Sequence, residues 1–304
     1  MGPSVRPGEP AHDGLGSGVM DARLVWNTWR RILRNDQLVA CVLHGASSEA
    51  EEMAGLTADE RTILADYMST RDATDTNIGM YRRGLVRNGL AALTLLPMTQ
   101  RLLELSGLDQ DTVAEDVARS TGYVDQGPNV WTIAGGFVAH LGTLREFAGP
   151  PQQDVLALDA ATVALARRLG EHAPLAWPDS AAGSGSGAER SVGGEPARFV
   201  ASGAAVLASS CHDLTAWIEN PYDFDAGEPL DVSSRQWLIY FPAADAAQTY
   251  AELSQRAGGV FTFLSVPKTC AEVSRAFGDL SATDVLDVID SLVELGVVVR
   301  EQPV

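Results

Sequence analysis

The hydrophobic pattern of this chain starts about twenty residues from its beginning. Residues 1–19 contain Gly and Pro but almost nothing to bury, which predicts a flexible tail. From Asp21 onward, apolar residues recur at spacings of three and four, the period of one helix face: Leu24, Val25, Trp29, Ile32 and Leu33. The pattern therefore predicts an amphipathic helix at the start of the folded part.

Helical signals continue up to about residue 170. The pair Thr57 and Glu60 has the spacing of a capping box, in which each side chain binds the other residue's backbone N–H, so a helix is expected to begin at Ala58. No convincing alternating strand occurs before residue 190, and the first 175 residues are therefore predicted to be all-α. The helices are expected over 58–68, 76–92, 97–106, 111–121, 129–147 and 153–170.

Composition changes at residues 178–196, where Gly and Ser dominate and Val192 is the only large apolar residue. Such a stretch is typical of a flexible linker. We therefore expect a helical domain over 20–177, a linker over 178–196 and a second domain over 197–304.

The second domain shows strand signals followed by helix signals. Strands are predicted over 198–209, 235–241 and 248–253, where β-branched and aromatic residues gather. Helices are predicted over 254–264, 270–277 and 282–295, and a short strand over 297–300; Thr269 and Ser281 have the spacing of N-terminal caps. This order outlines a winged-helix-like domain with a small antiparallel sheet, so the predicted fold class is α+β, with an all-α N-terminal domain before it.

Charge changes the interpretation of that outline. The chain has 304 residues and a net charge of −18, and residues 180–304 hold 17 acidic and 7 basic residues, a net charge of −10. The helix that would read DNA in a winged helix carries only acids on its exposed face, namely Asp284, Asp287, Asp290 and Glu294. Because a reading helix lies among phosphates, DNA binding is disfavoured.

The sequence also disfavours a membrane or secreted location and a catalytic or metal-binding site. No apolar run approaches the ~18–20 residues that span a bilayer, and no signal pattern opens the chain, so a cytoplasmic protein without membrane contact is expected. The five histidines are well separated, and Cys211, His212 and Asp213 alternate sides along an extended chain. We therefore expect no catalytic residue, no metal site and no cofactor in this chain.

Positive charge is concentrated in two segments without acids, at 22–35 and 76–103. Arginine is favoured at protein interfaces, so these segments are candidates for binding an acidic partner protein. The alternative is that they pair with Asp and Glu of neighbouring helices. The candidate interface residues are Arg30, Arg31, Arg82, Arg83 and Arg87.

Several segments, in order, resemble known families. Residues 35–66 (NDQLVACVLHGASSEAEEMAGLTADERTILAD) resemble the small helical subunit of extradiol dioxygenases. The continuation YRRGLVRNGLAALTLLPMTQRLLELSG looks like the partner subunits of multinuclear non-haem iron enzymes that modify ribosomally made peptides, of which the methanobactin pathway is an example. CHDLTAWIENP, RQWLIYF and SATDVLDVIDSLVELGVVV are similar to their winged-helix-type peptide-recognition module.

The resemblance implies that iron and oxidative chemistry belong to a separate enzyme. This chain would bind the leader of a precursor peptide and present the peptide to that enzyme as a hetero-complex. Binding would occur by β-augmentation, in which the leader adds a strand to an exposed sheet edge. The residues expected at that edge are Gln248, Thr249 and Tyr250, with Val285, Ile289 and Leu292 beneath them, and the acidic final helix would attract a basic leader.

Two alternatives stay open at this point. The first is a small-subunit-like component of an aromatic-ring-opening dioxygenase, suggested by the N-terminal helices. The second is an acidic winged-helix regulator, which would have to bind duplex DNA despite its charge.

Overall fold

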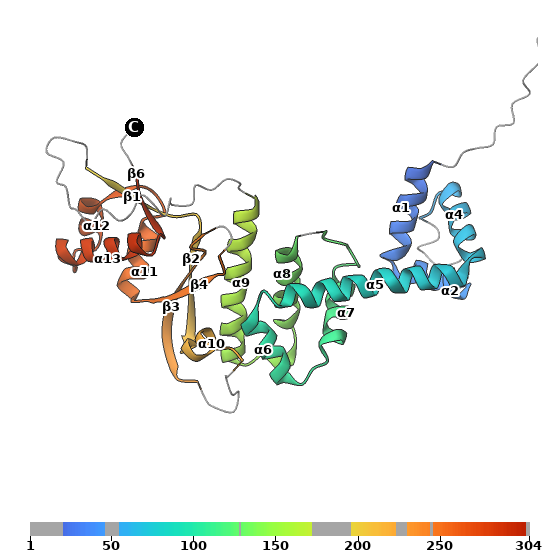
Figure 1. Ribbon diagram of the computed structural model, residues 1–304, viewed down its shortest axis with the longest axis horizontal. Coiled ribbons are helices and arrows are strands. Elements are labelled where there is room, and N and C mark those ends of the chain that lie inside the picture. Colours follow the sequence, from blue (N-terminus) through green and yellow to red (C-terminus); the bar gives the residue numbers. More distant parts are fainter. Residues whose placement is uncertain are drawn as a thin grey trace, which may run out of the picture. The chain divides into compact units, whose positions relative to one another are not determined.

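The computed structural model describes residues 21–45, 55–127, 129–171, 196–222, 230–243 and 246–301. The tail expected at 1–19 and the linker expected at 178–196, apart from its last residue, lie outside the described residues. The described chain is α+β, with helices and two small antiparallel sheets of three strands each (Figure 1). It divides into two compact units, residues 1–82 and 83–304.

The first unit is built from α1 (Ala22–Leu33), α2 (Asp36–His44), α4 (Ala58–Ser69) and the first half of α5 (Arg71–Leu93). The Asn35 side chain accepts hydrogen bonds from the first turn of α2, and Thr57 and Glu60 form the capping box that the sequence predicts at α4. The apolar faces of these helices meet in a core that includes Ile32, Leu38 and Leu64.

The second unit begins with helices. They are the rest of α5, then α6 (Pro97–Ser106), α7 (Gln110–Ser120), α8 (Val130–Leu141), the 3₁₀ turn η1 (Arg145–Phe147) and α9 (Pro150–Glu171). The sequence predicts a single helix over 129–147, but α8 ends at Leu141, and Gly142 follows as its C-cap. Helix α5 begins five residues earlier than expected, at Arg71.

The first sheet follows α9 and packs on it. It contains β2 (Ala205–His212), β3 (Val232–Tyr240) and β4 (Thr249–Leu253), in the order β2-β3-β4, with the short helix α10 (Thr215–Glu219) between β2 and β3. The second half of β3 is buried on both faces: Trp237 and Ile239 join the core of the helices, whereas Leu238 and Tyr240 join a second core. Because successive side chains of a strand point to opposite faces, β3 forms the wall between the two cores.

The second core is closed by the C-terminal elements. These are α11 (Gln255–Phe263), β5 (Lys268–Thr269), α12 (Cys270–Ala276), α13 (Ala282–Glu294) and β6 (Val298–Glu301), and the second sheet has the order β5-β1-β6, with β1 at Arg198–Ala201. The strand predicted over 198–209 is therefore two strands in different sheets, separated by a turn at residues 202–204. The capping boxes at Thr269 and Ser281 are formed as predicted.

The two cores of the second unit place α9 against β2 (Figure 1). Trp217, Trp237 and Ile239 lie in one apolar cluster with residues of α6 to α9, so the sheet completes the core of those helices. Among the described residues, no helix combines the length and apolar character that crossing a bilayer requires.

Candidate functional site

The two edges of the β2-β3-β4 sheet differ in how their backbone groups are used. At the β2 edge, Arg168 of α9 donates hydrogen bonds to the carbonyls of Gly203 and Ala205, at 2.8 and 3.0 Å. At the other end of β2, the Oδ2 atom of Asp154 accepts from the backbone N–H groups of Cys211 and His212, at 2.8 and 3.0 Å. Helix α9 thus covers both ends of this edge.

Strand β4 forms the opposite edge and pairs with β3 alone, from Thr249 opposite Tyr240 to Leu253 opposite Gln236. In an antiparallel ladder, every second residue turns its N–H and C=O groups away from the partner strand. Within the described parts of the chain, no hydrogen bond reaches the outer backbone groups of β4. Among the described residues, β4 is therefore the edge strand whose outer backbone groups have no hydrogen-bonded neighbour.

The side chains of β4 fix the strand in place from both faces. On the face toward α9, the hydroxyl of Tyr250 lies 3.2 Å from Oγ1 of Thr162, and Glu252 forms an ion pair with Arg235. On the other face, Ala251 and Leu253 pack against the second core. The side chains of β4 thus connect the strand to α9 on one face and to the second core on the other.

The residue before β4 ties the strand to the helices. The Gln248 side chain donates a hydrogen bond to the carbonyl of Leu95, at 3.3 Å, at the connection between α5 and α6. Of the expected edge residues, Thr249 and Tyr250 lie in β4, and Gln248 directly precedes it.

A buried carboxyl lies on the α9 side of the same strand. Asp159 is fully buried, and its Oδ2 accepts hydrogen bonds from the backbone N–H and the hydroxyl of Thr99, at 2.9 and 2.6 Å. Burial raises its pKa to about 6, although the Thr99 hydrogen bonds act in the opposite direction. Burial, with Asp159 nearby, also raises the pKa of Tyr250.

Asp159 has a structural task at the start of α6. The N-cap residue of that helix, Leu96, offers no side-chain acceptor, and the N–H of Thr99 is one of the first-turn groups without a partner inside the helix. Asp159 supplies the acceptor from α9. The sequence reasoning missed this residue, although an acid between apolar residues of a buried helix face was a usable signal.

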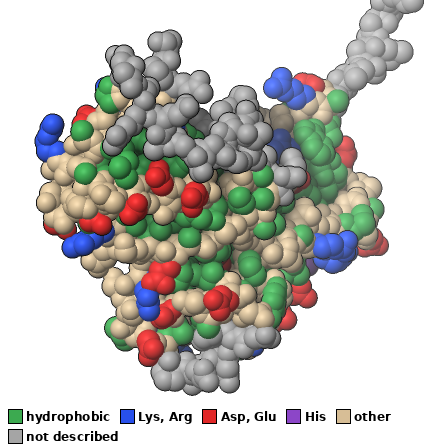
Figure 2. Space-filling view, turned by 60° about the vertical axis from the view of Figure 1, so that its left-hand side comes forward, with side chains coloured by type: hydrophobic (Ala, Val, Ile, Leu, Met, Phe, Trp, Pro, Cys, Tyr) green, Lys and Arg blue, Asp and Glu red, His purple; other side chains and the backbone are tan. Residues whose placement is uncertain are grey.

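The residues of α13 expected beneath the edge are core residues. Val285, Ile289 and Leu292 are buried in the second core, the cluster that Ala251 and Leu253 also contact. The opposite face of α13 exposes its acids, Asp284, Asp287, Asp290 and Glu294. In Figure 2, acidic side chains are spread over the visible face of the molecule among hydrophobic ones.

The five candidate arginines fall into two groups. Arg31 pairs with Glu60 at 3.4 Å, and Arg82 pairs with Asp36 at 2.7 Å, both inside the first unit. Arg30, Arg83 and Arg87 are exposed, and no ion pair joins them to the described residues. Arg83 and Arg87 are four residues apart on α5, so they share one helix face.

The sequence Cys211-His212-Asp213 does not form a nucleophilic set. Nδ1 of His212 lies 2.8 Å from Oδ2 of Asp154, whereas Asp213 accepts from Thr215 and pairs with Arg235 at 2.9 Å. Thr215 is the main reason that the pKa of Asp213 is lowered, with Arg235 adding to it. Asp154 thus binds the His212 ring as well as the backbone of β2. Sequence reasoning missed Asp154, because it lies 58 residues before His212 and gives no local signal.

The described residues include no group of three or more His, Cys, Asp or Glu side chains placed to hold a metal ion. A comparison of the chain with models of protein families finds no match, and a comparison with curated proteins finds no relative.

Proposed function

We propose that this chain is a partner protein without catalytic residues of its own, which binds the leader of a precursor peptide along the open edge of β4. The observation that carries the proposal is the contrast between the two sheet edges. Helix α9 occupies both ends of the β2 edge, whereas the outer backbone of β4 meets no partner among the described residues. A leader strand would find its hydrogen bonds there.

In this proposal, the peptide-binding module is of winged-helix type. It comprises the strands β2, β3 and β4 followed by α11, α12 and α13. Thr249 and Tyr250 form the edge and Gln248 precedes it, while Val285, Ile289 and Leu292 support the edge from the core and do not touch the peptide. The exposed acids of α13 supply a negative field that favours a basic leader.

The chain would then present its peptide to a separate multinuclear non-haem iron enzyme in the cytoplasm, which supplies the oxidative chemistry of ribosomal peptide modification. Iron belongs to that enzyme and not to this chain. The exposed Arg83 and Arg87 on α5, together with Arg30 on α1, are the strongest candidates for its docking, because Arg31 and Arg82 are already engaged in ion pairs.

The leader-binding step is tested by backbone hydrogen exchange in β4. The proposal expects a short reading frame for the precursor peptide beside this gene, and the probe is the leader that it encodes. Before binding, alternate amides of Thr249–Leu253 should exchange fast, and the leader should protect that alternate set. Glu252→Pro should abolish leader binding, because Glu252 turns its N–H away from β3 in this ladder and proline lacks that group. Uniform protection, or none, would refute binding at this edge.

Enzyme docking needs its own measurement. The double variant Arg83→Glu with Arg87→Glu should weaken co-purification with the iron enzyme that the proposal expects beside this gene at least tenfold, because it reverses two charges on one face. Arg275→Glu with Arg300→Glu, which reverses two other exposed arginines, on α12 and β6, is the matched control and should leave the complex intact. Equal loss in both would mean that net charge, and not this face, governs association.

A further inference from the structure

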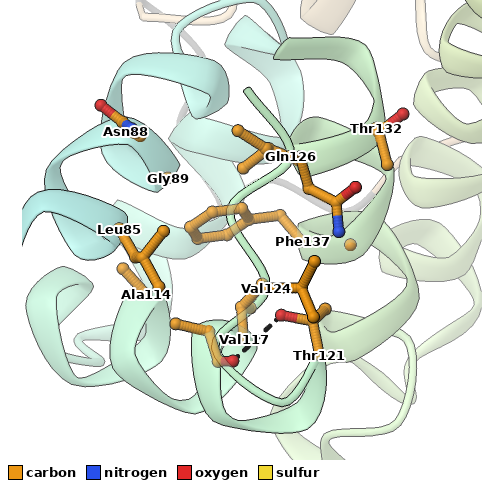
Figure 3. A pocket seen from close by; sticks show the side chains of 13 residues that line it. Leu85, Asn88, Gly89, Ala114, Val117, Thr121, Val124, Gln126, Thr132 and Phe137 are labelled. Carbon is orange, nitrogen blue, oxygen red and sulfur yellow. Dashed lines mark hydrogen bonds between the residues drawn. The ribbon is translucent and has the colours of Figure 1, made fainter. Parts of the chain in front are cut away.

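A cavity of ≈ 70 Å³ lies among α5, α7, α8 and the loop between α7 and α8, apart from the β4 edge. Figure 3 shows the ring of Phe137 crossing it, with Gly89 of α5 behind the ring. The space exists because residues facing it are small: Gly89, Ala118 and Gly136. Phe137 is fully buried, so its ring has a fixed position.

The helices around the cavity are in close contact at glycines, so they cannot move closer together to fill it. A Cβ atom on Gly89 would lie 3.1 Å from Cε2 of Phe137, and one on Gly136 would lie 3.4 Å from Cγ1 of Val117. The helices therefore approach each other at glycines, while the cavity beside them stays unfilled. A cavity of this size holds several waters, but its largely apolar wall gives them few partners, so an apolar group displaces them favourably.

The mouth of the cavity is polar. Asn88 of α5 and Gln126 of the loop after α7 lie on opposite sides of the Phe137 ring in Figure 3. Asn88 is exposed and Gln126 is half-buried, and neither carboxamide has a hydrogen-bond partner among the described residues. A carboxamide offers one donor group and one acceptor, which is the complement of a peptide bond.

We infer that this cavity binds one aliphatic side chain, of the size of leucine, from the peptide that the chain carries. The carboxamide of Gln126 binds the backbone amides of that peptide residue at the mouth. The inference rests on the proposed function, because it takes the occupant to be a peptide. The size of the cavity favours a single side chain, since sites for whole small molecules are several times larger.

The test uses isotope-labelled full-length protein and two capped amino acids. N-acetyl-L-leucinamide should give saturable NMR shifts at the Ala114 and Ala118 methyl groups, with a dissociation constant in the millimolar range. N-acetylglycinamide, which has the amides but no side chain, should bind at least tenfold more weakly. No shift at these methyl groups, or equal binding of the two probes, would overturn the inference.

Two variants separate the side-chain contact from the amide contact. Ala118→Leu fills the cavity and should abolish binding, whereas Ala139→Leu, the same exchange at an exposed position of α8, should not. If Ala118→Leu fails to fold, Gln126→Ala, at the mouth, should weaken leucinamide binding several-fold. If indole binds as tightly and ignores Gln126→Ala, the cavity is a small-molecule site and the inference is wrong.

The same spectra distinguish this failure from a failure of the proposed function. Leader binding is measured at the backbone amides of residues 249–253, and cavity binding at the alanine methyl groups. If the alanine methyl groups show no shift but the leader protects the β4 amides, only the inference is overturned. If the alanine methyl groups shift but the leader leaves the β4 amides unprotected, the leader-binding proposal is overturned. The cavity would then still bind an aliphatic side chain.

Discussion

Asp159 is an acidic residue that is fully buried. Its Oδ2 atom caps α6 through Thr99, but its buried Oδ1 atom has no hydrogen-bond partner among the described residues. An ionised carboxylate in such a place is costly, and the cost appears as a pKa raised from 3.8 to about 6. The folded protein thus holds a proton on Asp159 at pH values where the unfolded chain has released it.

This shift predicts a pH dependence of stability. A raised carboxyl pKa stabilises the fold below pH 3.8, and that contribution is lost as pH rises from 3.8 to about 6, in total about 3 kcal/mol. Asp159→Asn keeps an acceptor for Thr99 and removes the titration. Both proteins should be unfolded with urea between pH 4 and 7. As pH rises, the free energy of unfolding of the variant should increase relative to that of the wild type.

The control for that experiment is Gly84→Ala, which changes no titratable group and lies on α5 where an added Cβ would meet nothing within 4 Å. The difference between this variant and the wild type should stay constant over the same pH range. If Asp159→Asn also gives a constant difference, Asp159 is ionised in the folded protein at every pH tested, and the burial argument fails.

At the scale of an element, α5 carries two glycines with opposite surroundings. A Cβ on Gly84 would meet nothing within 4 Å, whereas one on Gly89 would lie 3.1 Å from the buried Phe137 ring. Alanine is favoured over glycine in a helix by up to about 1 kcal/mol, so Gly84→Ala should stabilise the protein by that amount. Gly89→Ala should destabilise it by about 1 kcal/mol net, because overpacking exceeds the helix gain. Thermal unfolding of both variants compares the two, and stabilisation by Gly89→Ala would show that Phe137 moves aside.

The helix caps show which signals are local. The boxes at Thr57, Thr269 and Ser281 were predictable because both partners lie within four residues. Ser281→Ala should cost about 1 kcal/mol of unfolding free energy, whereas Ser281→Gly should cost a few tenths. Chemical denaturation measures both. An equal cost for the two would place the effect outside the cap, in the packing of α13.

Elements without such signals were missed. Strand β5 has two residues, and α10 has five residues and no side-chain cap, so neither leaves a periodic pattern. The prediction of a single strand over 198–209 was wrong for another reason. The β-propensity of this segment is continuous, but Gly203 lies in a turn, and β1 and β2 on either side of it belong to separate sheets. Strand β4 was predicted from its sequence pattern over 248–253, whereas the role of α9 in covering β2 depends on contacts 35 to 58 residues apart.

At the scale of the molecule, periodicity shows that a helix buries one face but not what covers that face. The α9 pattern is apolar over most of its length, and its partners, among them Trp237 and Ile239, are nearly 80 residues later in the chain. The composition break at 178–196 predicts a boundary between two domains. The cores instead join the helices of the second unit to the sheet, across that segment.

The shared core predicts which parts of the protein unfold together. Trp237 is almost fully buried in the cluster that also holds α9 residues, and its Nε1 donates to Ser210 at 2.9 Å. Trp237→Ala should cost about 3–5 kcal/mol. Native-state hydrogen exchange should show this loss equally in α9 and β3, because they open as one unit, while α4 of the first unit keeps its protection.

The reciprocal variant is Leu64→Ala, in the core of the first unit, which should lower protection in α4 and leave α9 and β3 unchanged. A loss confined to the sheet after Trp237→Ala would mean that the helices of the second unit fold without it. Leader binding at β4 would then lack a rigid support, because Tyr250 reaches Thr162 of α9 only while helix and sheet stay together. Shared protection, by contrast, means that a peptide held at β4 is held by the whole second unit.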